Sequence, residues 1–175
     1  GDESLSQRPM KRVTDPLIDF GANFQLRNSE FLPIMVKGAE CPIPITYEMQ
    51  VASAQVKSAI MLAGLNTPGI TTIIEREKTR DHTETLFKYY GYDINIEEKD
   101  GKNFISFEGQ KTLNPVNIKV PGDPSSAAYP VVAGLICKNS NIKIKSVLLN
   151  PTRDGMYKCL DEMGANIRYF NKKNE

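Results

Sequence analysis

The chain has 175 residues, of which 40% are hydrophobic, and its 22 basic residues nearly balance 21 acidic ones. This length fits one domain or two small ones, and it can bury a core without disulfides or metals. The formal net charge of +1 excludes a polybasic nucleic-acid clamp, so an anionic partner needs a few placed groups. The sequence shows neither a membrane-length apolar run nor a signal-peptide pattern, so we expect no contact with a membrane.

The cysteines Cys41, Cys137 and Cys159 are odd in number and lack the spacing of a metal site. His82 is the single histidine, so no zinc site is expected. We expect reduced thiols that fill apolar gaps in a cytoplasmic protein, and a reactive thiol is the alternative.

The first predicted elements are a helix and two strands. The helix spans about Pro9–Phe20, although Pro16 lies inside it. The strands lie near Phe24–Arg27 and Pro33–Val36.

The middle of the chain predicts six elements in the order β-α-β-α-β-β. Apolar residues alternate in the first strand, Ser53 suits the cap of the first helix, and Thr79 suits the cap of the second. Gly91 suits the C′ position that ends this second helix, and Asp100-Gly101 is a hairpin signal. The predicted spans are Ile45–Val51, Ser53–Gly64, Ile70–Glu75, Thr79–Gly91, Asp93–Glu97 and Asn103–Glu108.

The last part of the chain starts in the same way and then stops. Its predicted elements alternate strand, helix, strand, helix, strand, and Ser125-Ser126 is expected to cap the first helix. The predicted spans are Val116–Val120, Ser125–Ile136, Asn141–Leu149, Pro151–Met163 and Asn166–Phe170.

These elements belong to an internal repeat. Helix-ending glycines recur at Gly21, Gly91 and Gly164, which are 70 and 73 residues apart. Thr-Arg-Asp occurs at 79–81 and again at 152–154, and other pairs keep the same spacing. The repeat predicts an α/β (α+β) fold built from β-α-β-α-β-β units of about 70 residues. Because the first unit lacks its leading strand and the last lacks its closing one, we expect an internal piece of a longer protein, incomplete at both ends.

The start of the helix at Ser53-Ala54-Gln55 is a candidate binding site. First-turn N–H groups have no intrahelical partner and the helix dipole is positive there, so an anion or a polyhydroxyl ligand could be held. An ordinary serine cap with a solvent-facing Gln55 is the alternative. Ser125-Ser126 has the same pattern and the same two interpretations.

Two arginines, Arg80 and Arg153, are predicted one residue inside their helices, where a cation opposes the dipole. A fork that binds phosphate or carboxylate would explain such a placement. The alternative is neutralisation by the adjacent Asp81 and Asp154.

Arg8 also begins a helix, with Lys11 and Arg12 close behind. These cations are either surface charge or a docking point for an anion. His82 is interpreted as a helix-surface residue. Helix N-termini with arginines indicate a small anionic molecule as the ligand.

Seven motifs occur in an order that resembles the EPSP synthase family (3-phosphoshikimate 1-carboxyvinyltransferases), closest to its bacterial class II branch. The resemblance extends from Gly1 to about Phe170. The motifs are Gly1-Asp2 with Arg8-Pro9-Met10, Ile45-Thr46-Tyr47, residues 52–59, residues 62–69, Thr79-Arg80-Asp81-His82-Thr83-Glu84, residues 121–128 and Asn150-Pro151-Thr152-Arg153.

The resemblance implies the enolpyruvyl transferase (inverted α/β barrel) fold, with two similar domains, each of three β-α-β-α-β-β units. Residues 1–118 would form the later part of the first domain, and residues 119–175 would begin the continuous part of the second. It also implies transfer of the enolpyruvyl group of phosphoenolpyruvate to the 5-hydroxyl of shikimate 3-phosphate, with release of phosphate, in aromatic amino-acid synthesis. No metal, organic cofactor, nucleic acid or membrane is implied, and the intact enzyme is expected to be a monomer.

By the same resemblance, Ser53, Ala54, Gln55 and Arg80 would bind shikimate 3-phosphate. Arg8 and Gln55 would contact phosphoenolpyruvate. No substrate contact is implied for Arg153, Ser125 or His82. The acid/base groups of the family lie outside these 175 residues, so we expect no catalytic residue in this chain and no turnover by it alone.

Two other functions are compatible with the sequence. UDP-N-acetylglucosamine enolpyruvyl transferases share the fold, but the reactive cysteine loop typical of them would lie upstream of Gly1 or is absent. The chain could also be a non-catalytic module on the same scaffold. Binding of shikimate 3-phosphate distinguishes these alternatives. A role in RNA processing, known for a relative of this fold, is disfavoured by the neutral charge.

Overall fold

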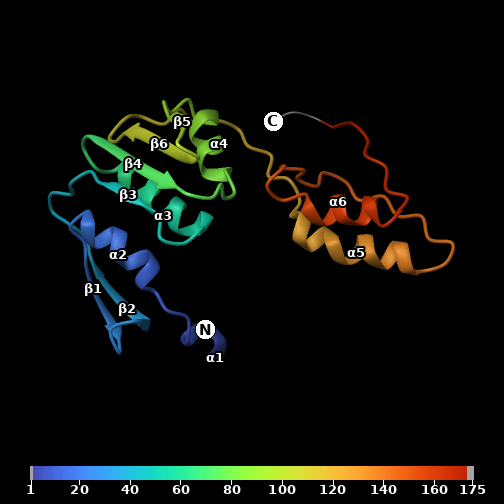
Figure 1. Cartoon of the computed structure of the whole chain (residues 1–175), viewed down its shortest axis with the longest axis horizontal. Coiled ribbons are helices and arrows are strands. Elements are labelled where there is room, and N and C mark those ends of the chain that lie inside the picture. The colour runs from blue at the N-terminus through green and yellow to red at the C-terminus, as the bar shows by residue number, and fades with distance from the viewer. Residues whose placement is uncertain (1, 173–175) are drawn as a thin grey trace. The chain divides into compact units, whose positions relative to one another are not determined.

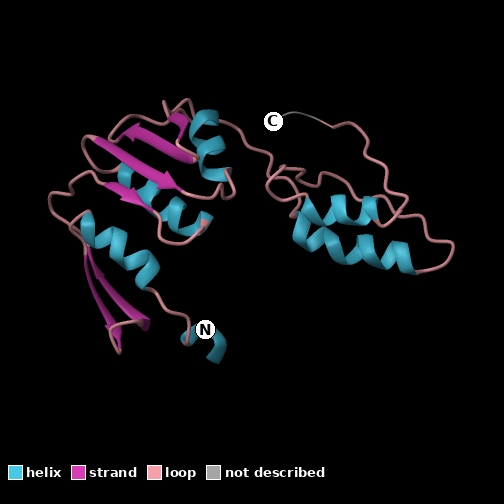
Figure 2. Ribbon diagram, viewed as in Figure 1, coloured by secondary structure: helices cyan, strands magenta, loops and turns pink. Residues whose placement is uncertain are grey.

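A computed structural model of the chain describes residues 2–172 (Figures 1 and 2). The chain forms two compact units, Gly1–Val116 and Asn117–Glu175. Each unit is described by itself below.

The first unit opens with two helices and a hairpin. α1 (Glu3–Ser6) was not predicted, and it begins where the Asp2 side chain accepts the N–H of Leu5 at 2.7 Å. α2 (Lys11–Asp19) continues through Pro16, whose ring is buried. β1 (Asn23–Arg27) and β2 (Phe31–Lys37) pair antiparallel as a two-stranded sheet.

The predicted β-α-β-α-β-β order is confirmed in the rest of this unit. Its strands form a sheet in the order β3-β4-β6-β5, with β3 parallel to β4 and the other pairs antiparallel (Figure 1). Asp100 and Gly101 have φ of 53° and 71°, which matches the two-residue hairpin turn expected from Asp-Gly. The elements are β3 (Thr46–Glu48), α3 (Ala54–Leu65), β4 (Ile70–Glu75), α4 (His82–Tyr89), β5 (Asn95–Lys99) and β6 (Lys102–Glu108).

Helices α3 and α4 pack on the same face of this sheet. A Cβ at Gly64 of α3 would lie 2.7 Å from the Phe107 ring of β6, so glycine allows the close approach. On α4, the Phe87 ring meets the edges of Tyr92 and Phe107 with centroids 5.3 and 5.4 Å apart. The buried core consists of Phe20, Met49, Val56, Ile60, Met61, Ile73, Phe87, Tyr92, Ile105 and Phe107.

The repeated glycines end helices in the same way. Gly21, Gly91 and Gly164 have φ of 102°, 71° and 86°, and each donates its N–H to a carbonyl three residues earlier. The following residue donates to the carbonyl five residues before it, which completes a Schellman motif. The C′ position predicted for Gly91 is therefore confirmed.

The second unit contains two helices, α5 (Pro124–Ile136) and α6 (Gly155–Glu162). The three strands predicted after residue 115 are wrong: within the described residues 117–172 the only bridge joins Gly122 to Val147. A strand needs a neighbouring strand for its backbone hydrogen bonds, and these apolar segments are largely exposed, with Val120 at 82%.

The helices of this unit also begin elsewhere than predicted. Asp123, and not Ser125 or Ser126, caps α5, because its carboxylate accepts the N–H groups of both serines at 3.3 and 2.9 Å. Pro124 occupies the first turn, where its missing N–H costs nothing. α6 begins at Gly155, after a turn that was predicted as helix from Pro151.

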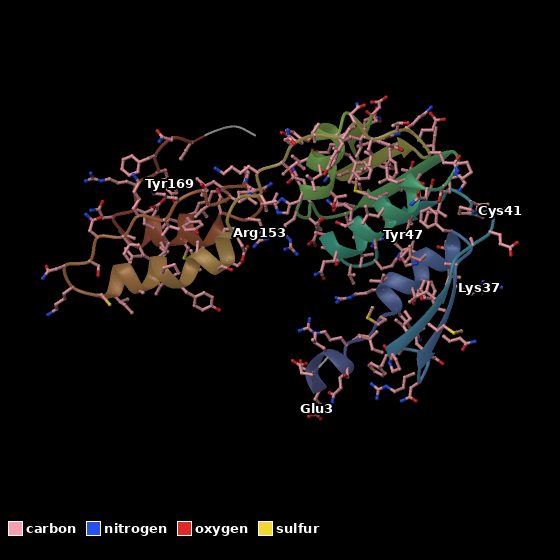
Figure 3. The ribbon with its side chains drawn as sticks, turned by 180° about the vertical axis from the view of Figure 1, so that it is seen from behind. Glu3, Lys37, Cys41, Tyr47, Arg153 and Tyr169 are labelled. Atoms are coloured by element: carbon pink, nitrogen blue, oxygen red, sulfur yellow. The ribbon has the colours of Figure 1, made fainter. Side chains whose placement is uncertain are left out.

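The cysteines do not fill apolar gaps. Cys41, Cys137 and Cys159 are free and exposed, and Cys41 lies in a surface loop (Figure 3). Cys137 follows the last residue of α5. Across residues 2–172, no helix has the length and apolar character needed to cross a membrane.

Candidate functional site

The candidate site lies where β3 and β4 end. These strands are parallel, with Thr46 opposite Thr72 and Glu48 opposite Ile74, so the chain leaves both at the same edge of the sheet. Residues 49–53 lead from β3 into α3, and residues 76–81 lead from β4 into α4. Residues 49–52 and 75–77 line a pocket of about 230 Å³ at this edge, and its lining does not include Ser53, Gln55 or Arg80. Ligands commonly bind at this edge of parallel strands in α/β proteins.

Ser53 caps α3 as predicted. Its backbone is extended, with φ −141° and ψ 108°, and its hydroxyl accepts the Val56 N–H at 3.4 Å. Ala54 and Gln55 form the first turn, where N–H groups lack intrahelical acceptors and the helix dipole is positive. The Gln55 side chain is exposed, so it is available to a ligand together with the Ser53 hydroxyl.

Arg80 lies two residues before α4 and not inside it, which corrects the predicted placement. Thr79 does not cap the helix, because its hydroxyl and its N–H both donate to Oε1 of Glu75 at the end of β4. Asp81 occupies the cap position without a side-chain cap bond. The Arg80 side chain is exposed and forms no salt bridge with any of the described residues.

Beneath these connections lies a buried cluster of charges that sequence reasoning missed. The Lys57 ammonium forms ion pairs with Glu75, 3.1 Å away, and with Glu84, and all three side chains are at most 4% exposed. The hydroxyls of Ser58 on α3 and Thr83 on α4 are hydrogen-bonded at 2.6 Å. One signal was present in the sequence: Lys57 is the only charged residue of a largely apolar helix, and such helices are buried.

Arg8 lies between α1 and α2, and its side chain is exposed. Its backbone N–H donates to the Leu5 carbonyl. Within residues 2–172, no hydrogen bond or ion pair links Arg8 to Ser53, Gln55 or Arg80. The structure therefore brings the Ser53–Gln55 turn and the Arg80 connection to one edge, whereas it gives no contact between them and Arg8.

Arg153 forms an ion pair within its own unit. Its guanidinium donates to Asp123 at 3.0 Å and to the Ser125 hydroxyl at 2.7 Å. The partner is thus Asp123 and not the adjacent Asp154, which pairs with Lys158. Hydrogen bonds from Ser126, with the charge of Arg153 as a smaller cause, lower the pKa of the Asp123 carboxyl.

His82 is the first residue of α4 and is half-buried. In the part of the chain that the structure describes, no group of three His, Cys, Asp or Glu side chains is arranged to hold a metal ion.

Comparison with known proteins decides the family. The sequence matches the family of EPSP synthases (3-phosphoshikimate 1-carboxyvinyltransferases) over residues 1–175. The chain belongs to the EPSP synthase family. It is 53% identical, over 173 residues, to the 3-phosphoshikimate 1-carboxyvinyltransferase of Zymomonas mobilis, and the alignment covers 99% of this chain and 38% of that protein.

Solved structures agree with this assignment. The EPSP synthase of Acinetobacter baumannii is similar with a TM-score of 0.81 and 40% identity, covering 99% of this chain and 38% of that one. The enolpyruvyl transferase NikO of Streptomyces tendae has a TM-score of 0.63 at 19% identity, covering 91% and 40%, which shows a shared fold. The chain thus spans about 40% of the length of the family members it matches.

Proposed function

We propose that the complete protein transfers the enolpyruvyl group of phosphoenolpyruvate to the 5-hydroxyl of shikimate 3-phosphate. In this reaction the hydroxyl gives up its proton and its oxygen bonds to C2 of phosphoenolpyruvate, while a proton adds to the methylene carbon. Phosphate then leaves from C2, and loss of a proton from that carbon restores the double bond. The part of the enzyme that binds shikimate 3-phosphate is proposed to include the Gly1–Val116 unit.

The arrangement of the α3 N-terminus beside the Arg80 connection carries this proposal. The first-turn N–H groups at Ala54 and Gln55 and the Ser53 hydroxyl offer donors to a phosphate or a sugar-like hydroxyl. Arg80 adds an exposed guanidinium from the neighbouring connection, and a guanidinium binds phosphate through two parallel hydrogen bonds. Family membership supports shikimate 3-phosphate as the anion bound there.

Phosphoenolpyruvate is proposed to contact Gln55 and Arg8. Gln55 projects from the first turn of α3 and could reach both substrates. Arg8 is an exposed cation without a salt bridge within the described residues, so it is available to pair with the carboxylate or phosphate of phosphoenolpyruvate.

The acid and base of the reaction are proposed to come from parts of the enzyme beyond these residues. We place residues 1–118 in one domain and residues 119–175 in the other. We also propose that the complete enzyme is a cytoplasmic monomer, and the three free thiols of this chain are compatible with a reducing compartment.

Calorimetric titration with shikimate 3-phosphate tests the site. We expect the chain to bind it and Arg80→Ala to weaken binding about tenfold to 100-fold, because a charge-assisted phosphate contact is lost. Lys88→Ala is the matched control, since it removes the same charge from the last turn of α4 and should leave binding unchanged. Equal losses in both variants, or no binding by the folded chain, would argue against the proposed site.

A further inference from the structure

The buried cluster of Lys57, Glu75 and Glu84 joins the three elements that carry the candidate site. Lys57 lies in the first turns of α3, two residues beyond Gln55. Glu75 is the last residue of β4, and Glu84 lies in the first turn of α4. The Lys57 ammonium therefore links α3, which begins at the Ser53 cap, to both ends of the connection that bears Arg80.

Glu75 also contacts the residue next to Arg80. The Thr79 hydroxyl and the Thr79 N–H, at 3.3 Å, both donate to Oε1 of Glu75, the same oxygen that faces Lys57. Thr79 precedes Arg80 directly, so the carboxylate that Lys57 holds fixes the backbone from which Arg80 projects.

Stability alone does not account for these charges. Desolvating three charged groups costs free energy that their attraction often fails to recover, and apolar residues of similar size usually serve a core as well. Lys57 Nζ and Glu84 Oε2 have no well-aligned hydrogen bond among the described residues, so ion pairing alone holds this ammonium. Desolvation makes such a cluster costly for folding, and this one joins α3 to both ends of the connection for which we propose ligand binding, so we infer a role in their geometry.

We propose that Lys57 is a positioning residue, which holds the Arg80 connection in register with the Ser53–Gln55 turn through Glu75 and Thr79. Here the register is the position of the Arg80 connection relative to the Ser53–Gln55 turn. The inference rests on the proposed function, because it assumes that this relative position serves the binding of shikimate 3-phosphate. It adds a residue that touches no substrate and acts through the carboxylates.

Amide hydrogen exchange of the ligand-free chain, measured residue by residue, tests this role. In Lys57→Met we expect the amide of Thr79, which donates to Glu75, to exchange at least about tenfold faster, relative to that of Ile105 in the middle of the sheet. The reason is that opening this connection no longer requires the Lys57–Glu75 ion pair to break. Lys111→Met is the control, since Lys111 forms an exposed ion pair with Glu108 outside the cluster.

A second variant keeps the test decisive if Lys57→Met fails to fold. Lys57→Met leaves two buried carboxylates unpaired, whereas Lys57→Met/Glu84→Gln leaves only Glu75, which Thr79 still contacts. The same local acceleration is expected in the double variant. Equal acceleration at Thr79 and Ile105, no change, or loss of folding in both variants would make Lys57 a stability residue and overturn the proposal.

A titration with shikimate 3-phosphate then connects the register to binding. Lys57→Met should weaken binding about tenfold, and Lys111→Met should leave it unchanged. Unchanged binding in a Lys57→Met chain that shows the local acceleration would overturn the link to the site. Absence of binding by the unsubstituted chain contradicts the proposed function itself, whereas the exchange pattern decides the anchoring role without any ligand.

Discussion

Single side chains decide where the helices of this chain begin. Ser53 and Asp123 each accept N–H groups at the start of the helix that follows, whereas Thr79 turns back to Glu75. A threonine just before a helix can either accept an N–H of the first turn or donate its hydroxyl to another nearby group. Burial of Glu75 selects between them, because a buried carboxylate must be supplied with donors.

The single side chain of Glu48 makes the folding stability depend on pH. Hydrogen bonds from Lys102 and Arg76, at 2.8 and 2.7 Å, lower the pKa of its carboxyl below the ordinary value of 4.5. A lowered folded-state pKa contributes stability that is present above the unfolded-state pKa and is lost as the pH falls through the folded-state pKa.

We therefore expect Glu48→Gln to be less stable than the unsubstituted chain at pH 7. The difference should shrink as the pH falls below 4.5 and should also shrink in 1 M salt, which screens exposed pairs to a Debye length of about 3 Å. Thermal unfolding of both chains from pH 7 to pH 3 measures this. A difference that persists unchanged at pH 3 would show that the ion pairs are not its cause.

At the scale of elements, local patterns predicted more than long-range ones. The helix ends at Gly21, Gly91 and Gly164 and the turn at Asp100-Gly101 depend on a few adjacent residues, so they could be identified from the sequence. Strands predicted from alternation near residues 116–120, 141–149 and 166–170 did not form, because a strand also depends on a neighbour that alternation does not reveal.

In the candidate site, too, features set by adjacent residues could be predicted and a feature set by tertiary packing could not. The Ser53 cap follows from its position before an apolar helix. The binding role of Arg80 comes from the family resemblance and stays a prediction. The Lys57 cluster could not be located, because it joins residues 18 and 27 positions apart through tertiary packing, and hydropathy gives no pairing between them.

Phe87 provides the prediction for an element, since it attaches α4 to the sheet. Its ring is 3% exposed and contacts Tyr92 and Phe107. Phe87→Ala should cost about 3–5 kcal/mol of unfolding free energy, because it leaves a cavity between helix and sheet. Urea unfolding measures the loss.

Leu86 is the matched control on the same helix. It is 43% exposed, so Leu86→Ala should change the unfolding free energy by about 0.5 kcal/mol or less. Similar losses for both substitutions would contradict the packing of α4 through Phe87.

At the scale of the whole molecule, the chain spans about 40% of the length of its relatives. The proposed reaction removes a proton from the hydroxyl and adds one to the methylene carbon, which requires a base and an acid, and we assign neither to these residues. With both substrates present, the chain alone should release no phosphate above background. A rate within about tenfold of an intact enzyme would refute this expectation.

The most direct test of the account is to observe where shikimate 3-phosphate binds. Backbone amide NMR shifts of the chain should change on its addition at Ala54, Gln55 and residues 79–81, and not along β5 or α5. That pattern would establish the α3 N-terminus and the Arg80 connection as one binding site. Shifts confined to other elements, or none from a folded chain at millimolar ligand, would contradict it.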